Sequence, residues 1–114
     1  MNPFVIDKPA ILDRLGGDED IFAMMLEMYL QEVDSNCQAL QAALDAGNVA
    51  TLQREAHTVK GLLATVSDDD GAARALALEQ MGKLGQLDGA AALLGEVQTR
   101  LREVAAVLAA ELGR

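Results

Sequence analysis

The chain offers few side chains that could attack a substrate, hold a metal ion or transfer a proton. It has one histidine, His57, and one cysteine, Cys37, so metal clusters built from several His and Cys residues are impossible. Its glycines are scattered rather than gathered in a phosphate-binding loop, which argues against an ATP-using enzyme. Cys37 falls on the apolar stripe of an expected helix, where a packed, inert thiol is expected. His57 is therefore the side chain on which a chemical role can be built.

His57 has neighbours that suit a phosphorylated imidazole. On a helix, Lys60 at i+3 and Gly61 at i+4 adjoin the ring. A lysine there would not favour a protonated histidine, but it would suit a phosphohistidine carrying about two negative charges. Glycine inside a helix costs roughly 0.5–1 kcal/mol relative to alanine, and one reason for its presence is close access by another protein's backbone. A solvated lysine and a helix-packing glycine are the plain alternatives, but the three residues together favour a chemical role.

The helix face around His57 predicts an exposed imidazole. The core stripe passes through Ala56, and His57 lies about 100° further round the helix. The residues that share its face are polar or small: Gln53, Arg54, His57, Lys60, Gly61 and Ala64. We therefore expect the ring to reach solvent within a docking surface that also includes adjoining parts of the preceding helix.

Helices are expected along the whole chain, because good helix formers dominate and strand-like alternation is absent. Side chains that can cap helix N-termini stand at Asp7, Asp18, Asn48, within Asp68–Asp70, and at Asp88. Glycines that can end helices stand at Gly16-Gly17, Gly47 and Gly85. The helix after Asp18 should run for roughly 28 residues, about 42 Å. The helix after Asp68–Asp70 carries the shortest apolar stripe, which comprises Ala77, Leu78, Met81 and Leu84.

Four long apolar stripes joined by short turns predict an all-α fold. We expect an antiparallel up-down-up-down four-helix bundle with a short additional N-terminal helix across one end. The 114 residues form one domain, 1–114, with the first helix over about 8–15 and the bundle over about 18–113. Only the N-terminus is expected to be loose.

The acidic run Asp68-Asp69-Asp70 has two possible interpretations. A capped and solvated helix start is the favoured one, because acidic side chains suit the positive end of a helix. A cation bound by the three carboxylates is the alternative. No calcium-loop pattern supports the cation, and adjacent aspartates at a helix start point in different directions. No metal site is predicted.

Composition excludes several classes of partner. A formal charge of −9 without clusters of Lys or Arg argues against nucleic-acid binding. The longest apolar run, Val104–Ala110, is too short to cross a bilayer. A single cysteine suits a reducing compartment. We expect a cytoplasmic protein that contacts neither nucleic acid nor membrane.

The residues around His57 resemble a known family. The stretch Ala56-His57-Thr58-Val59-Lys60-Gly61, followed by Ala64, is similar to the core motif of histidine-phosphotransfer (HPt) domains. In that family the histidine is the phosphoacceptor, and a lysine and a glycine occupy these same offsets. Leu78-Glu79 and Gly82-Lys83 fall where the family often has a Leu-Glu or similar polar pair and a Gly-basic pair. The resemblance is strong over roughly residues 18–84.

The resemblance implies roles for individual residues. Glu79 would hydrogen-bond the ring nitrogen of His57 that is not phosphorylated, which would fix the tautomer and aim Nε2 outward. Lys60 and Lys83 would place positive charge near the phosphoryl group. The residues expected to give a partner access or contact are Gly61, Gln53, Arg54, Ala64, Leu62 and Lys83.

Four positions depart from the family pattern. Leu62 and Leu63 stand where the family usually has small residues, and Ser67-Asp68 replaces a common Gly-Ala pair. The departures affect partner fit and local packing rather than the phosphoacceptor. Leu62 is either an exposed apolar contact for a partner or a half-buried packing residue, and the sequence leaves both alternatives open.

The activity that the resemblance implies is relay of a phosphoryl group. His57 would accept it from a receiver-domain aspartate and pass it to another receiver in a two-component phosphorelay. Partners would be response-regulator receiver domains and a hybrid sensor kinase. The chain would need no cofactor of its own, since the receiver would supply magnesium. It would be a phosphocarrier rather than an enzyme.

Two other functions remain open on the sequence. The dimeric phosphoacceptor domain of a sensor kinase typically has an acidic residue and an Arg-Thr-Pro run after its histidine, whereas Thr58 follows here and no proline occurs after Pro9. A monomer is therefore expected. The second alternative is a helical adaptor that is never phosphorylated, which the intact group of His57, Lys60 and Gly61 disfavours.

Overall fold

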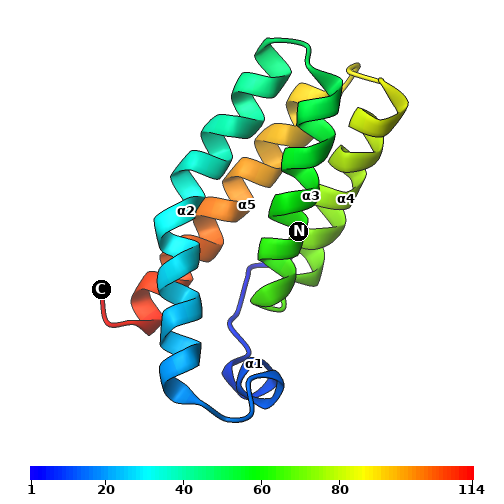
Figure 1. The fold of residues 1–114 in the computed structure, drawn as a ribbon. Helices are drawn as coiled ribbons and strands as arrows, with labels where there is room; N and C mark the ends of the chain where they lie inside the picture. Colours follow the sequence, from blue (N-terminus) through cyan, green and yellow to red (C-terminus); the bar gives the residue numbers. More distant parts are fainter.

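The computed structural model describes residues 1–114 and contains helices only. The helices are α1 (Lys8–Arg14), α2 (Glu19–Asp45), α3 (Val49–Thr65), α4 (Asp69–Leu84) and α5 (Ala90–Glu111). The four long helices lie side by side, and α1 lies at one end of them (Figure 1). The molecule extends over 42 × 22 × 22 Å. The predicted all-α fold class, a four-helix bundle with a short N-terminal helix, is confirmed.

Each long helix packs against two neighbours, so the four surround one core. Contacts join α2 to α3 and α5, and α4 to α3 and α5. The predicted stripes of α2, α3 and α5 point inward, and Leu26, Leu52 and Leu101 are fully buried. Full burial of a leucine side chain stabilises a fold by about 1.5–3 kcal/mol, so these stripes determine how the helices are rotated.

The stripe predicted for α4 is only partly correct. Leu78 is fully buried, but Leu84 is 67% exposed. The helix ends at Gly85, which has a left-handed φ of +68°, so Leu84 lies at the end of the helix and outside the core. The expectation that Leu84 belongs to the buried face is wrong.

Helix N-termini are capped as predicted at four of the five positions. The side chains of Asp7, Asp18, Asn48 and Asp68 each accept a hydrogen bond from backbone N–H groups of the helix that follows. The predicted cap at Asp88 is wrong. The N-cap of α5 is Gly89, which makes no side-chain bond and adopts φ +81°. The chain turns tightly there, because the Ala90 N–H donates to the Leu87 carbonyl at 3.0 Å, and Asp88 lies outside the helix start.

Asp68 is not solvated, contrary to the expectation for the acidic run. It is 3% exposed, and its carboxylate accepts two hydrogen bonds of 2.8 Å from the guanidinium of Arg100, which is also 3% exposed. A Cβ on Gly71 would lie 2.1 Å from Asp68 Oδ2, so glycine at that position makes room for the pair. Asp69 and Asp70 are exposed, as predicted.

The N-terminal segment is fastened to the bundle rather than loose. The side chain of Arg100 donates to the Asn2 carbonyl at 2.7 Å, and the Phe4 N–H donates to the Glu103 carboxylate at 2.7 Å. Phe4 is 7% exposed and lies under the Arg100 guanidinium, 5.7 Å from ring centre to cation. The buried ion pair of Asp68 and Arg100 therefore also holds the start of the chain.

The Ser67 departure lies at the turn between α3 and α4. Ser67 has φ +62°, a left-handed conformation that glycine adopts more easily. Arg14, at the end of α1, donates to Ser67 Oγ and to the Thr65 carbonyl, both at 2.9 Å. The serine hydroxyl thus gives α1 a contact that glycine could not provide.

None of the helices is long and apolar enough to span a membrane.

Replacing Asp68 by alanine should destabilise the protein strongly. The change removes the α4 cap and both hydrogen bonds of Asp68 to the buried Arg100 guanidinium, which keeps only the partly exposed Glu103 as an acidic partner. Breaking a buried ion pair costs about 3–5 kcal/mol. Urea denaturation measures the free energy of unfolding. Asp69→Ala is the control, because Asp69 is exposed and contributes about 0.3–1 kcal/mol through the helix dipole. Equal losses in the two variants would contradict the structural role of Asp68.

Candidate functional site

Helices α3 and α4 bring three of the predicted site residues together. His57 and Lys60 project from one face of α3, and Glu79 projects from α4 toward both. The three side chains differ in exposure: 69% for His57, 28% for Lys60 and 14% for Glu79. The carboxylate is therefore mostly covered, while the imidazole stands in solvent as the sequence predicts.

The Glu79 carboxylate fixes the orientation and tautomer of His57. Nδ1 of His57 lies 2.9 Å from Oε2 and 3.1 Å from Oε1 of Glu79. An ionised carboxylate can only accept hydrogen bonds, so Nδ1 carries the proton and donates it. In the neutral ring the lone pair then resides on Nε2, at the solvent side of the imidazole. This arrangement presents a nucleophilic nitrogen away from the bundle.

Lys60 shares the same carboxylate. Its Nζ donates to Glu79 Oε1 at 2.9 Å and to Oε2 at 3.3 Å. The hydrogen bond from Lys60, followed by that from His57, holds the pKa of Glu79 below its usual range. The carboxylate is therefore ionised at neutral pH. The lysine cation lies one turn from the imidazole, and the glutamate links the two.

The surface beside His57 is an open depression at the α3–α4 seam. The residues that line it are Ala50, Gln53, Arg54, His57, Thr58 and Glu79. Gly61 and Ala64 continue the face further along α3, and both are exposed. A Cβ built on Gly61 meets no atom within 4 Å, so the space above this residue is open. Another protein can approach the ring from this side.

Leu62 and Lys83 lie at the edges of this region. Leu62 is half-buried and packs against the core, which decides between the two alternatives that the sequence left open. Lys83 is exposed at the end of α4, four residues after Glu79. Its expected role near a phosphoryl group stays a prediction.

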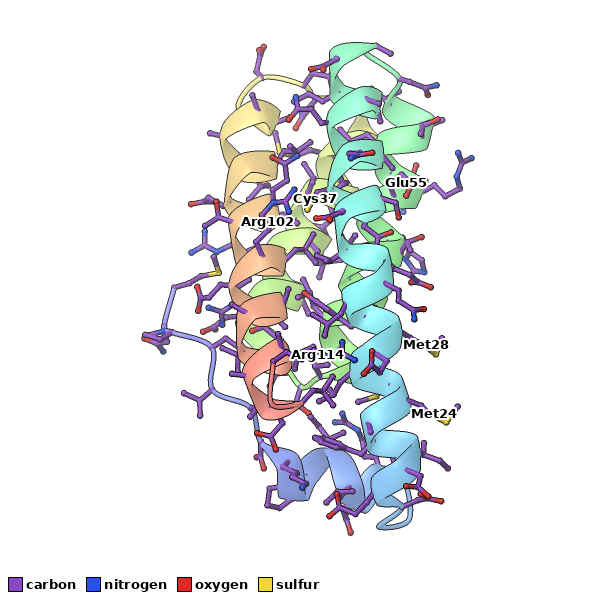
Figure 2. All side chains as sticks on the ribbon, turned by 90° about the vertical axis from the view of Figure 1, so that its left-hand side faces the viewer. Met24, Met28, Cys37, Glu55, Arg102 and Arg114 are labelled. Carbon is purple, nitrogen blue, oxygen red and sulfur yellow. The ribbon has the colours of Figure 1, made fainter.

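Helix α2 carries an exposed apolar strip that was not predicted from the sequence. Ile21, Met24 and Met28 are 46%, 63% and 56% exposed. Figure 2 shows Met24 and Met28 pointing outward from one side of α2, with Glu55 of α3 further along that side. The signal was present in the sequence, since the three residues share a helix face at i, i+3 and i+7 that is separate from the buried stripe.

The remaining candidates for chemistry lie elsewhere or are inert. Cys37 is buried in the core of α2, and burial raises the pKa of its thiol. A buried, protonated thiol is a weak nucleophile. No group of three or more His, Cys, Asp or Glu side chains is arranged to hold a metal ion.

Comparison with known proteins identifies relatives of this arrangement. A protein-family model described as "Hpt domain" matches residues 24–107. Among solved structures, the histidine-containing phosphotransfer protein B (HptB) from Pseudomonas aeruginosa is similar, with a TM-score of 0.84 and 24% sequence identity. The match covers 93% of this chain and 92% of the HptB chain, which supports the fold. A search of curated proteins found no match.

The lowered pKa of Glu79 predicts a pH-dependent contribution to stability. A carboxylate whose pKa is lowered in the folded state stabilises the protein above its unfolded pKa, about 4.3, and loses this contribution as pH falls through the folded value. Glu79→Gln should therefore be less stable than the parent protein between about pH 5 and pH 6. The difference should shrink as the pH falls below the unfolded pKa and through the lowered folded pKa of Glu79.

Urea denaturation at several pH values measures this difference. Glu96→Gln is the matched control, because Glu96 contacts Arg74 at 3.5 Å in an exposed pair and should contribute little. A Glu79→Gln difference that stays constant down to low pH would contradict the proposed coupling.

Proposed function

The chain belongs to the Hpt domain family, and we propose that Nε2 of His57 is the atom that carries the phosphoryl group. Membership of this family places the protein in histidine phosphotransfer of two-component signalling. The observation that supports His57 is its geometry: Glu79 occupies Nδ1, and the other ring nitrogen faces solvent in a side chain that is 69% exposed.

The transfer follows from this geometry. Nε2 attacks the phosphorus of a receiver phosphoaspartate in line with the bond to the leaving oxygen. A P–N bond forms, the P–O bond to the aspartate breaks, and the aspartate leaves as a free carboxylate. The imidazole gains positive charge as the bond forms, and Glu79 stabilises that charge through Nδ1–H. The reverse reaction with a second receiver returns the group to an aspartate.

Lys60 contributes through its charge. In the unphosphorylated protein it neutralises Glu79, to which it donates at 2.9 Å. A phosphoryl group on Nε2 brings about two negative charges one turn away, and the flexible lysine side chain can turn toward them. Lys83, four residues beyond Glu79 on α4, adds a second cation at the edge of the site. Magnesium belongs to the receiver, so this chain needs no cofactor.

The docking surface joins the His57 face of α3 to the exposed strip of α2. Gly61 and Ala64 provide a flat, open approach, and Ile21, Met24 and Met28 provide exposed apolar area. A transient complex with a receiver domain or a hybrid sensor kinase needs only a small interface with an apolar centre. The polar or half-buried residues at its rim are Gln53, Arg54, Leu62 and Lys83. Exposed methionines suit such a surface because their side chains adapt to different partners. The protein acts as a monomer, which leaves this face free.

The direct test is transfer of labelled phosphate from a phosphorylated receiver domain. The parent protein should acquire label, and His57→Gln should acquire none, because glutamine lacks the nucleophilic nitrogen. Circular dichroism would establish that the exposed substitution leaves the fold intact. Label on the His57→Gln variant would rule out His57 as the acceptor. Failure of the parent protein with a panel of receivers would favour the adaptor alternative.

The docking surface is tested by placing charge on the apolar strip. Met24→Asp combined with Met28→Asp should raise the receiver concentration needed for half-maximal transfer by roughly tenfold, because apolar side chains lose their burial in the complex. Val5→Asp is the matched control. Val5 is 80% exposed in the N-terminal segment, which runs along the opposite side of the bundle (Figure 2). Equal transfer by both variants would place the receiver elsewhere.

A further inference from the structure

Gly82 lies where α4 approaches the backbone of α3 closely. A Cβ built on Gly82 would stand 2.9 Å from the backbone nitrogen of Gln53, 3.0 Å from its Cα and 3.1 Å from its Cβ. Ordinary contacts of a Cβ atom are 3.4–4 Å. Two of these three atoms are backbone, so rotating a side chain cannot relieve the overlap. A methyl group at position 82 can fit only if the two helices move apart.

Two other glycines inside helices lack this constraint. A Cβ on Gly61 or on Gly95 would meet nothing within 4 Å. Gly82 lies inside α4, and it is not among the glycines with positive φ. No turn or left-handed conformation therefore requires glycine at position 82. The requirement comes from the neighbouring helix.

The contact between Gly82 and Gln53 lies one helical turn from His57 on α3 and one helical turn from Glu79 on α4. Gln53 precedes His57 by four residues on α3, and Gly82 follows Glu79 by three residues on α4. These spacings place each pair on one helix face. The Glu79 carboxylate reaches His57 at 2.9 and 3.1 Å and Lys60 at 2.9 and 3.3 Å, so all four distances depend on how closely α4 lies against α3.

We infer that Gly82 is a positioning residue for phosphotransfer, acting through the separation of α3 and α4 that lets Glu79 hold Nδ1 of His57. The inference rests on the proposed role of His57. Moving from 2.9 Å to an ordinary contact of 3.4–4 Å separates the helices by about half to one ångström. A separation of that size weakens hydrogen bonds that are now near their best lengths, and the imidazole is then free to adopt its other tautomer and to rotate.

The test compares Gly82→Ala with Gly95→Ala. Both replace a glycine inside a helix by alanine, but only the first meets a neighbouring backbone. Nitrogen-15 NMR of His57 at a pH where the ring is neutral reports the fraction with the proton on Nδ1. We expect both Gly82→Ala and Glu79→Ala to lose most of the Nδ1–H population, and Gly95→Ala to keep it. Phosphoryl transfer from a receiver should fall at least about tenfold in Gly82→Ala, since a misplacement of about 1 Å can cost a hundredfold.

Two further variants separate positioning from loss of stability. Val104→Ala trims a fully buried side chain of α5 and should lower the melting temperature while leaving the His57 tautomer unchanged. If Gly82→Ala alone does not fold, the double variant with Gly95→Ala restores helix stability and is measured instead. The inference is overturned if a folded Gly82→Ala variant keeps the parental tautomer and transfer rate. If the parent protein accepts no phosphate, the proposed function fails, but the tautomer measurement still decides whether Gly82 positions Glu79.

Discussion

The site depends on one carboxylate shared across the α3–α4 seam. Glu79 accepts hydrogen bonds from His57 Nδ1 and from Lys60 Nζ, and its own side chain is 14% exposed. The imidazole can therefore stand 69% exposed and still have a defined tautomer and orientation. Exposure gives a partner access, and the hydrogen bond supplies the order that a solvated side chain would otherwise lack. Neither property alone would give a histidine suited to phosphotransfer.

A buried ion pair stabilises the N-terminal end of α4, in contrast to the exposed imidazole at the α3–α4 seam. Asp68 and Arg100 are each 3% exposed and pair through two hydrogen bonds of 2.8 Å. Arg100 also donates to the Asn2 carbonyl, so the N-terminal segment is held by the same guanidinium. The pair of Lys60 and Glu79 is partly exposed, whereas the pair of Arg100 and Asp68 is sealed from solvent. Because Asp68 is the N-cap of α4 and Glu79 lies within that helix, the buried pair also fixes the helix from which the Glu79 carboxylate projects.

Most helix boundaries could be predicted, and the errors have local causes. Caps at Asp18 and Asn48 follow from short polar side chains before apolar periodicity, and the structure confirms both. Asp88 has the same residue type, but the backbone turns through Gly89 and the helix starts without it. Leu84 continues the apolar spacing of α4, yet no neighbouring helix covers it. Residue type and apolar period show which residues can cap a helix or face the core. The path of the chain and the positions of the neighbouring helices decide whether they do so.

The sequence by itself determined the helical content, the inward faces of α2, α3 and α5 and the exposure of His57. All three follow from the 3.6-residue period, which is a property of neighbouring residues on one helix. Tertiary structure decided which side chains distant in sequence form contacts. Glu79 and His57 are 22 residues apart, Arg100 and Asp68 are 32 apart, and Glu103 and Phe4 are 99 apart. A family resemblance could suggest the first of these contacts. The distances themselves depend on how closely the helices pack. Contacts between helices, such as that of Gly82 against Gln53, set this packing, and they exist only in the folded bundle.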